Sequence, residues 1–75
     1  MPPLAVMPRG LTLEDWSAQL RIDVSETVPV YMGGDWQDWA RSCLAIDAFQ
    51  KSAAPRPEYY EKWEDWAERV FQTMT

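Results

Sequence analysis

The sequence predicts a small all-α protein whose main feature is an antiparallel helix hairpin, and three observations predict it. Near-copies of a Trp-x-x-Trp-Ala motif stand 27 residues apart, at 36–40 and 63–67, and a weaker echo surrounds Trp16. Two indoles three residues apart lie on one helix face, so each motif predicts the start of an amphipathic helix. Prolines just before the second motif predict a short connection between two helices.

The first eleven residues are expected to be extended. Three prolines in this segment fix φ and remove backbone donors. Leu4 and Val6 are apolar, which a solvated tail does not need. The segment is therefore either a disordered terminus or an arm laid along a neighbouring subunit. We expect a proline-rich arm over 1–11 and a single small helical domain over 12–75.

A short first helix is expected over about 12–21. Thr12 is a suitable N-cap, and the acidic Glu14 and Asp15 suit the positive end of the helix dipole. An apolar stripe then repeats at helical spacing, and it consists of Leu13, Trp16 and Leu20.

The segment 23–32 is expected to be extended as well, because its apolar residues alternate along the chain. Pro29 excludes a helix interior there, and if the segment is a strand, Pro29 is compatible only with one at the edge of a sheet. The two interpretations left open are an extended linker and one short edge strand. Gly33-Gly34 then predicts a turn. The alternating residues are Val24, Val28, Val30 and Met32.

Residues 35–52 and 57–73 are expected to form the two helices of the hairpin. Asp35 is a good N-cap for the first helix. Pro57 can occupy the first turn of the second helix, where no backbone donor is lost. The second helix carries the strongest apolar stripe of the chain, formed by Tyr59, Trp63, Trp66 and Val70.

An antiparallel arrangement of these two helices separates the two motif copies. Helices joined by a short loop pack in opposite directions, so their Trp-rich starts lie at opposite ends. We therefore expect each motif to pack against the far end of the other helix, against the first helix, or against another chain. Asp65 and Arg69 are expected to pair on the outer face, while Glu58 and Glu61 suit the positive end of the second helix.

Length and composition limit the function classes. A chain of 75 residues forms a marginal core, and Cys43, its one cysteine, cannot form a disulfide within the chain. The chain has no histidine, so we expect no metal site and no cofactor. Its net charge of −5 disfavours nucleic acid and anionic membranes as partners. We expect a soluble protein made in a reducing cytoplasm.

The sequence offers no set of residues typical of catalysis, so we do not expect an enzyme. Glu61, Glu64 and Asp65 have the spacing to share a helix face, but carboxylates on a helix are usually a solvated surface. Cys43 lies on the apolar stripe of residues 35–52, and we interpret it as a small core residue.

The tryptophans are the candidate site residues. Tryptophan at helical spacing is usually core, but it is also enriched at protein interfaces. Five indoles exceed what so small a core is expected to enclose, so we predict that at least one contacts another subunit. The predicted protein-interface residues are Trp16, Trp36, Trp39, Trp63 and Trp66, together with Leu4, Val6 and Tyr59.

The motif resembles that of small tailed-bacteriophage proteins. The resemblance covers residues 33–72, and its elements are Asp35-Trp36-Gln37-Asp38-Trp39-Ala40, then Phe49, Pro55-Arg56-Pro57 and Trp63-Glu64-Asp65-Trp66-Ala67-Glu68-Arg69. These proteins are short and acidic and are encoded among virion structural genes. The resemblance implies a structural component of a virion, at the neck, tail or fibre attachment, and supplies no catalytic residues.

Two functions are therefore carried forward. The first is a non-enzymatic virion protein, made in the host cytoplasm, that binds a larger virion structural protein in multiple copies of a symmetric assembly. The alternative is a small acidic phage regulator whose carboxylates imitate nucleic acid on a basic site of a host protein. Salt-insensitive binding favours the first function, and strong salt sensitivity favours the second.

Overall fold

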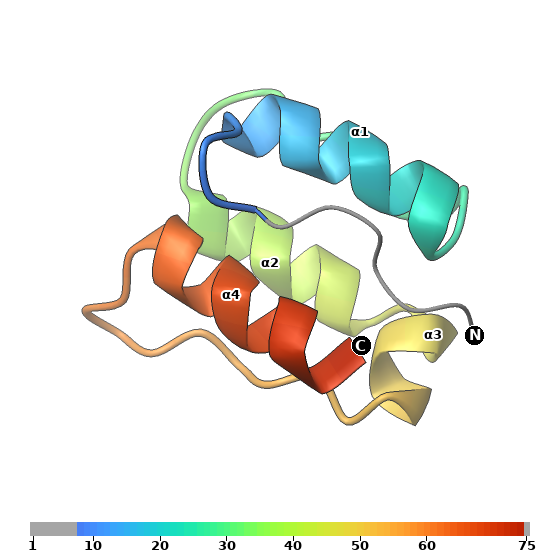
Figure 1. The fold of residues 1–75 in the computed structure, drawn as a ribbon. Coiled ribbons are helices and arrows are strands. Elements are labelled where there is room, and N and C mark those ends of the chain that lie inside the picture. The colour runs from blue at the N-terminus through green and yellow to red at the C-terminus, as the bar shows by residue number, and fades with distance from the viewer. Residues whose placement is uncertain (1–7, 75) are drawn as a thin grey trace.

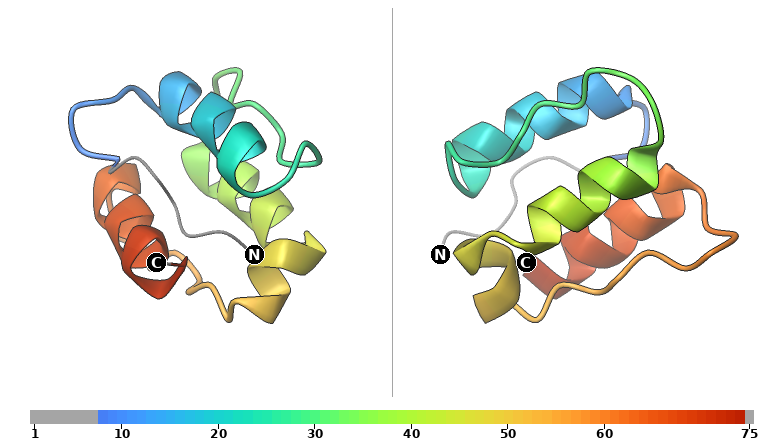
Figure 2. Two further views of the ribbon diagram at one scale, coloured as in Figure 1. Left: turned by 45° about the vertical axis from the view of Figure 1, so that its right-hand side comes forward. Right: turned by 180° about the vertical axis from the view of Figure 1, so that it is seen from behind.

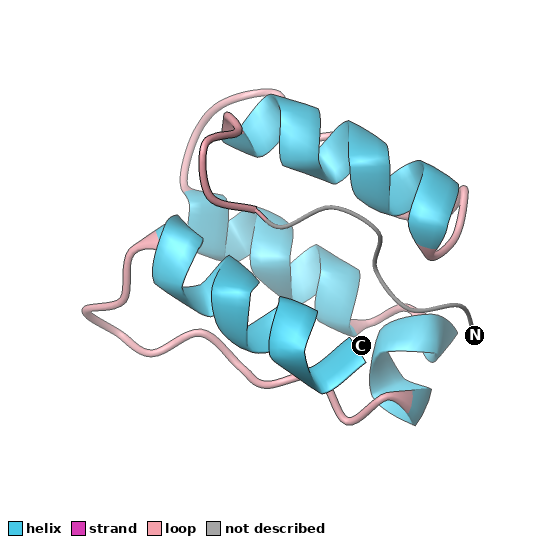
Figure 3. Ribbon diagram, in the orientation of Figure 1, coloured by secondary structure: helices cyan, strands magenta, loops and turns pink. Residues whose placement is uncertain are grey.

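The computed structural model describes residues 8–74, which form helices and loops (Figures 1 and 3). The helices are α1 (Leu13–Asp23), α2 (Trp36–Leu44), α3 (Asp47–Lys51) and α4 (Trp63–Met74). The part of the chain that the structure describes contains no strand, so the predicted all-α class is confirmed. Within these residues no helix has the length and apolarity of a membrane span.

The first helix begins where the sequence predicts. The hydroxyl oxygen of Thr12 accepts a hydrogen bond from the backbone N–H of Asp15 at 3.1 Å, so Thr12 caps α1. The helix ends at Asp23, two residues beyond the predicted end. Its buried side chains are the whole predicted stripe, Leu13, Trp16 and Leu20, and in addition Ser17.

The predicted helix over 35–52 is in fact two helices. Asp35 caps α2 as predicted, since its carboxylate accepts a hydrogen bond from the backbone N–H of Gln37 at 3.0 Å. After nine residues α2 ends, and Ile46 adopts an extended conformation before α3 begins. An unbroken helix over 35–52 would be about 27 Å long, against about 18 Å for α4, so its last turns would extend beyond its neighbours. The break instead lets α3 close one end of the core, where Phe49 is fully buried.

The predicted helix over 57–73 begins six residues late, because residues 52–62 form a loop. Pro57 is therefore not in a helical turn, and Glu58 and Glu61 are not at the helix start. The carboxylate of Glu61 accepts a hydrogen bond from the backbone N–H of Glu58 at 3.0 Å. The backbone N–H of Glu61 also bonds to the carbonyl of Glu58 at 3.1 Å, so these residues form a single turn ahead of α4.

The helix directions differ from the prediction. Figures 1 and 2 show α1, α2 and α4 side by side and running the same way, so the antiparallel hairpin is wrong. The loops 24–35 and 52–62 each return along the length of the molecule to start the next helix. A loop of this size can span about 36 Å when extended, twice the length of α4, so nothing forces neighbouring helices to be antiparallel.

The predicted extended segment 23–32 is an irregular linker. Its first residue ends α1, and the backbone N–H of Val28 closes a turn on the carbonyl of Ser25 at 3.1 Å. Val28 is fully buried whereas Met32 is 92% exposed, so the alternating residues do not share one face. The segment is a linker, but it is not extended over its first half, and the edge strand is wrong for these described residues.

The predicted arm over 1–11 is described only in part. Residues 1–7, which include Leu4 and Val6, lie outside the described residues. Pro8 is fully buried, and the backbone N–H of Leu11 bonds to the Pro8 carbonyl at 3.2 Å. The described end of the arm is therefore attached to the helical domain.

Candidate protein-binding surface

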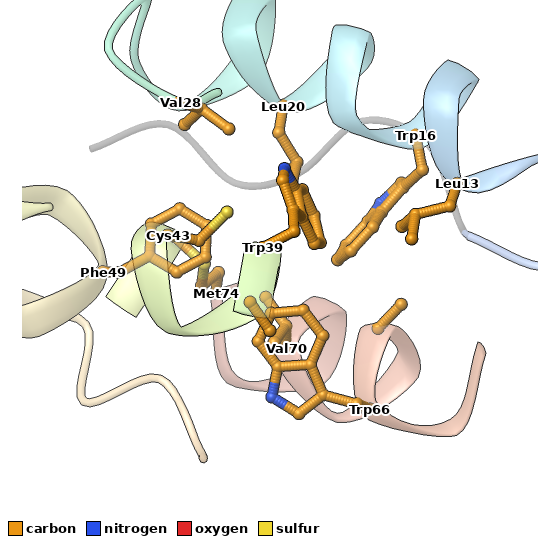
Figure 4. Close-up of a cluster of buried hydrophobic side chains, with 12 residues drawn as sticks. Leu13, Trp16, Leu20, Val28, Trp39, Cys43, Phe49, Trp66, Val70 and Met74 are labelled. Atoms are coloured by element: carbon orange, nitrogen blue, oxygen red, sulfur yellow. The ribbon is translucent and has the colours of Figure 1, made fainter. Parts of the chain in front are cut away.

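Three tryptophans form the centre of the core. Trp16, Trp39 and Trp66 are each the fourth residue of α1, α2 and α4, and because these helices are parallel the three indoles meet. Each pair of rings has its centroids 6.0 Å apart, with interplanar angles of 64° to 89°. Figure 4 shows their side chains pointing toward one another. Such edge-to-face contacts are favourable beyond the area that they bury.

Two of these indoles also hold the loops that return between the helices. The indole N–H of Trp39 donates to the backbone carbonyl of Pro29 at 2.6 Å, and that of Trp66 donates to the carbonyl of Pro55 at 2.8 Å. The N–H of a buried indole needs an acceptor. Proline has no backbone N–H to donate, but its backbone carbonyl can accept this bond. The two motif copies therefore share a structural unit: a proline in the loop and a tryptophan in the following helix.

Burial overturns part of the interface prediction. Trp16, Trp39 and Trp66 are 1%, 8% and 0% exposed, so they cannot contact another subunit while the chain stays folded. The prediction is wrong for these three because the parallel helices let one core enclose all of them. Trp36 and Trp63 are half-buried at the edge of the same cluster. Only these two of the five tryptophans offer ring surface to a partner.

The half-buried rings line a groove between the starts of α1, α2 and α4. This groove, of about 460 Å³, is lined by Tyr31, Trp36 and Trp63 and by the carboxylates of Glu14 and Glu64. Trp36 packs on Trp66 with ring centroids 5.8 Å apart, and Trp63 packs on Trp16 at 6.2 Å. We call it the aromatic groove.

Two tyrosines stand beside this end of the molecule. Tyr59 and Tyr60 are 82% and 92% exposed, and their rings form an edge-to-face pair with centroids 4.7 Å apart. The side-chain amide of Gln37, at the start of α2, donates to the carbonyls of Glu58 (2.9 Å) and Tyr59 (3.3 Å). The sequence placed Tyr59 on a helical stripe, which is wrong because it lies in the loop 52–62. Tyr60 is not among the predicted interface residues, although a pair of tyrosines close to Pro57 could have indicated an exposed turn.

Parallel helices also gather charge at one end. Three helix starts together present their positive dipole ends, and acidic side chains in each first turn offset them. Those of α1 are Glu14 and Asp15, that of α2 is Asp38, and those of α4 are Glu64 and Asp65.

Ion pairs tie the loop 52–62 and the residues before α1 to α4. Arg69 donates two hydrogen bonds to the carboxylate of Glu61, at 2.6 and 2.8 Å, and a third to the carbonyl of Arg56 at 2.8 Å. The bond from Arg69 holds the pKa of Glu61 below its ordinary value. The predicted pairing of Asp65 with Arg69 is wrong, because Arg9 bonds to Asp65 at 3.3 Å.

Cys43 is a core residue, as predicted. It is fully buried on α2, and desolvation raises its pKa to about 12. The side chain is therefore a neutral thiol at physiological pH, and a neutral thiol is a poor nucleophile. Among the described residues, no three His, Cys, Asp or Glu side chains are grouped closely enough to bind a metal ion.

Comparisons of the chain with protein-family models, with curated proteins and with solved structures give no match.

Proposed function

We propose that this chain is a non-enzymatic structural protein of a bacteriophage virion, at the neck, tail or fibre attachment. It binds a larger virion structural protein in several copies. The motif resemblance supplies the virion setting. The observation that supports protein binding is the pair of exposed tyrosines, Tyr59 and Tyr60, which are 82% and 92% exposed on a loop that Gln37 fixes to α2.

Tyrosines of this kind are typical anchors of protein interfaces. Tyr is enriched among the residues that dominate binding energy, and the bonds from Gln37 to the backbone of this loop reduce the entropy that the loop loses on binding. Trp36 and Trp63 add half-buried ring surface at the same end of the molecule. The contact surface proposed here is therefore this end, and the buried tryptophans position it.

Mass spectrometry of purified virions tests the proposal. We expect the chain at a fixed ratio to a larger structural protein. Replacing both tyrosines with serine should lower its incorporation at least about thirty-fold, because an interface anchor contributes about 2 kcal/mol or more. Ile22→Ser is the matched control, since Ile22 is 78% exposed near the end of α1 and away from the proposed contact. Absence of the chain from purified particles, or equal loss in both variants, contradicts the proposal.

The acidic regulator is kept as a second candidate because of one observation. The parallel helices collect first-turn carboxylates from α1, α2 and α4 at one end. Such an end can be attracted to a basic site on another protein, with an affinity that falls steeply as salt is added. A partner complex that dissociates between low and physiological salt favours this candidate. A complex insensitive to salt favours the virion protein with its aromatic contact.

A further inference from the structure

We propose that the aromatic groove binds an arginine side chain of the partner protein. The guanidinium would lie against the rings of Trp36 and Trp63, between the carboxylates of Glu14 and Glu64. This inference rests on the proposed function, because it names the chemistry of the partner at the same end of the molecule. Three properties of the groove support it: its ring surfaces, its charge and its rigidity.

The ring surfaces suit a planar cation. Tyr31, Trp36 and Trp63 line the groove together, and a volume of about 460 Å³ leaves room for a long side chain. A guanidinium over the face of an indole is attracted by the negative charge of the ring face, and arginine stacks on such rings better than lysine does.

The charge of the groove is negative, and no basic side chain of residues 8–74 forms an ion pair with its two glutamates. Glu14 and Glu64 are its charged lining residues. Two arginines pair with other acids. Arg9 bonds to Asp65 and Glu68, and Arg41 pairs with Asp38. The three dipole ends contribute about half a positive charge each, which is less than the full charges of the first-turn acids.

The groove is also held in place by the core. Trp36 and Trp63 each pack on a fully buried indole, Trp66 and Trp16 respectively. Tyr31 is fixed at both ends, because its backbone N–H donates to the hydroxyl of Ser17 and its own hydroxyl donates to the carbonyl of Gly34. A site that is already ordered loses less entropy when it binds.

The test is a titration of the ¹⁵N-labelled full chain, followed by NMR. The probe is the capped peptide acetyl-Gly-Arg-Gly-amide, and its control is the same peptide with citrulline, which keeps the shape of arginine without the charge. We expect the indole N–H signals of Trp36 and Trp63 to shift with the arginine peptide. The signals of Trp39 and Trp66 should stay in place, because their N–H groups are bonded to proline carbonyls inside the fold.

Two variants and one control locate the site. Glu14→Gln and Glu64→Gln should each weaken arginine-peptide binding about three-fold, the size of a surface ion pair. Glu26→Gln, an exposed carboxylate on the loop 24–35 that does not line the groove, should leave binding unchanged. Circular dichroism of each variant checks that the helices remain. Equal shifts with citrulline, shifts spread over the whole surface, or no shift at the solubility limit of the peptide overturn the inference.

Failure of this inference and failure of the proposed function give different results. A chain that is absent from purified virions but responds selectively to the arginine peptide refutes the virion role and retains the groove. A chain that is incorporated into virions but does not distinguish arginine from citrulline retains the role and refutes the cation site.

Discussion

The two loops that return between the parallel helices use the same device and differ in how the rest of each loop is held. In loop 24–35 the carbonyl of Pro29 accepts the indole N–H of Trp39, and in loop 52–62 the carbonyl of Pro55 accepts that of Trp66. Beyond that shared bond, the first loop is fixed by neutral groups. The second has neutral bonds as well, from the amide of Gln37 to the carbonyls of Glu58 and Tyr59, and it adds an ion pair between Glu61 and Arg69.

The neutral contacts of loop 24–35 are buried. Ser17 on α1 is fully buried, and its hydroxyl accepts a hydrogen bond from the backbone N–H of Tyr31 at 2.9 Å. Val28, in the loop itself, is fully buried in the core. In loop 52–62 the carboxylate of Glu61 is 10% exposed and pairs with Arg69. One loop is therefore held by neutral contacts and the other by an ion pair added to neutral contacts, so the two loops should respond differently to acid.

The largest expected effect comes from the tryptophans that the loops share. Trp66→Ala and Trp39→Ala should each destabilise the fold by about 3–5 kcal/mol, because each removes a buried indole and leaves a cavity. Trp66 should cost more, since it is fully buried whereas Trp39 is 8% exposed. Urea unfolding followed by circular dichroism measures the loss. A cost below about 1 kcal/mol at either position would contradict a shared core.

A smaller effect is expected in loop 24–35. Ser17→Ala removes the acceptor for the backbone N–H of Tyr31 and should cost about 1–2 kcal/mol, because a part-buried donor loses its partner. The same urea experiment measures it. Thr27→Ala, which removes an exposed hydroxyl from the same loop, is the control and should cost less than Ser17→Ala. Equal costs would show that the Ser17 bond does not hold the loop.

The smallest effect separates the two loops by pH. The lowered pKa of Glu61 means that its contribution to stability is present above the ordinary glutamate pKa of about 4.3 and is lost as pH falls through the lowered value. The contribution should be below about 1 kcal/mol, because Arg69 is 39% exposed and solvent screens the pair. Glu61→Gln should therefore flatten the acid limb of the stability curve, whereas Ser17→Ala should lower the curve without changing its acid slope. If the free energy of unfolding of Glu61→Gln falls with acid as steeply as that of the original chain, the proposed difference between the loops is wrong.

Local features of the fold could be predicted from the sequence. The caps Thr12 and Asp35 act through contacts one turn away, so they are visible in a short window, and the burial of Cys43 followed from the apolar stripe. The start of α4 could not be predicted in the same way. Pro57 and Glu58 are as suitable for a first helical turn as for a loop, and the loop is held by side chains distant in sequence: Gln37 donates to the carbonyl of Glu58 and Arg69 to that of Arg56.

The direction of the helices and the candidate site were the least predictable features. A short connection favours antiparallel neighbours, but the length of a loop sets only an upper limit on its span. The division of the five indoles between core and surface followed from that direction, since parallel helices bring three of them together and leave Trp36 and Trp63 at the edge. The repetition of proline and tryptophan in both copies was the sequence signal for this arrangement.

The parallel arrangement that forms the tryptophan cluster is tested most directly by proton–proton nuclear Overhauser effects between the indole rings of the full chain. We expect cross-peaks joining Trp16, Trp39 and Trp66 to one another, because the ring centroids are 6.0 Å apart in every pair. Cross-peaks from Trp39 to residues at the end of α4, such as Met74, without any to Trp66 would contradict the parallel arrangement.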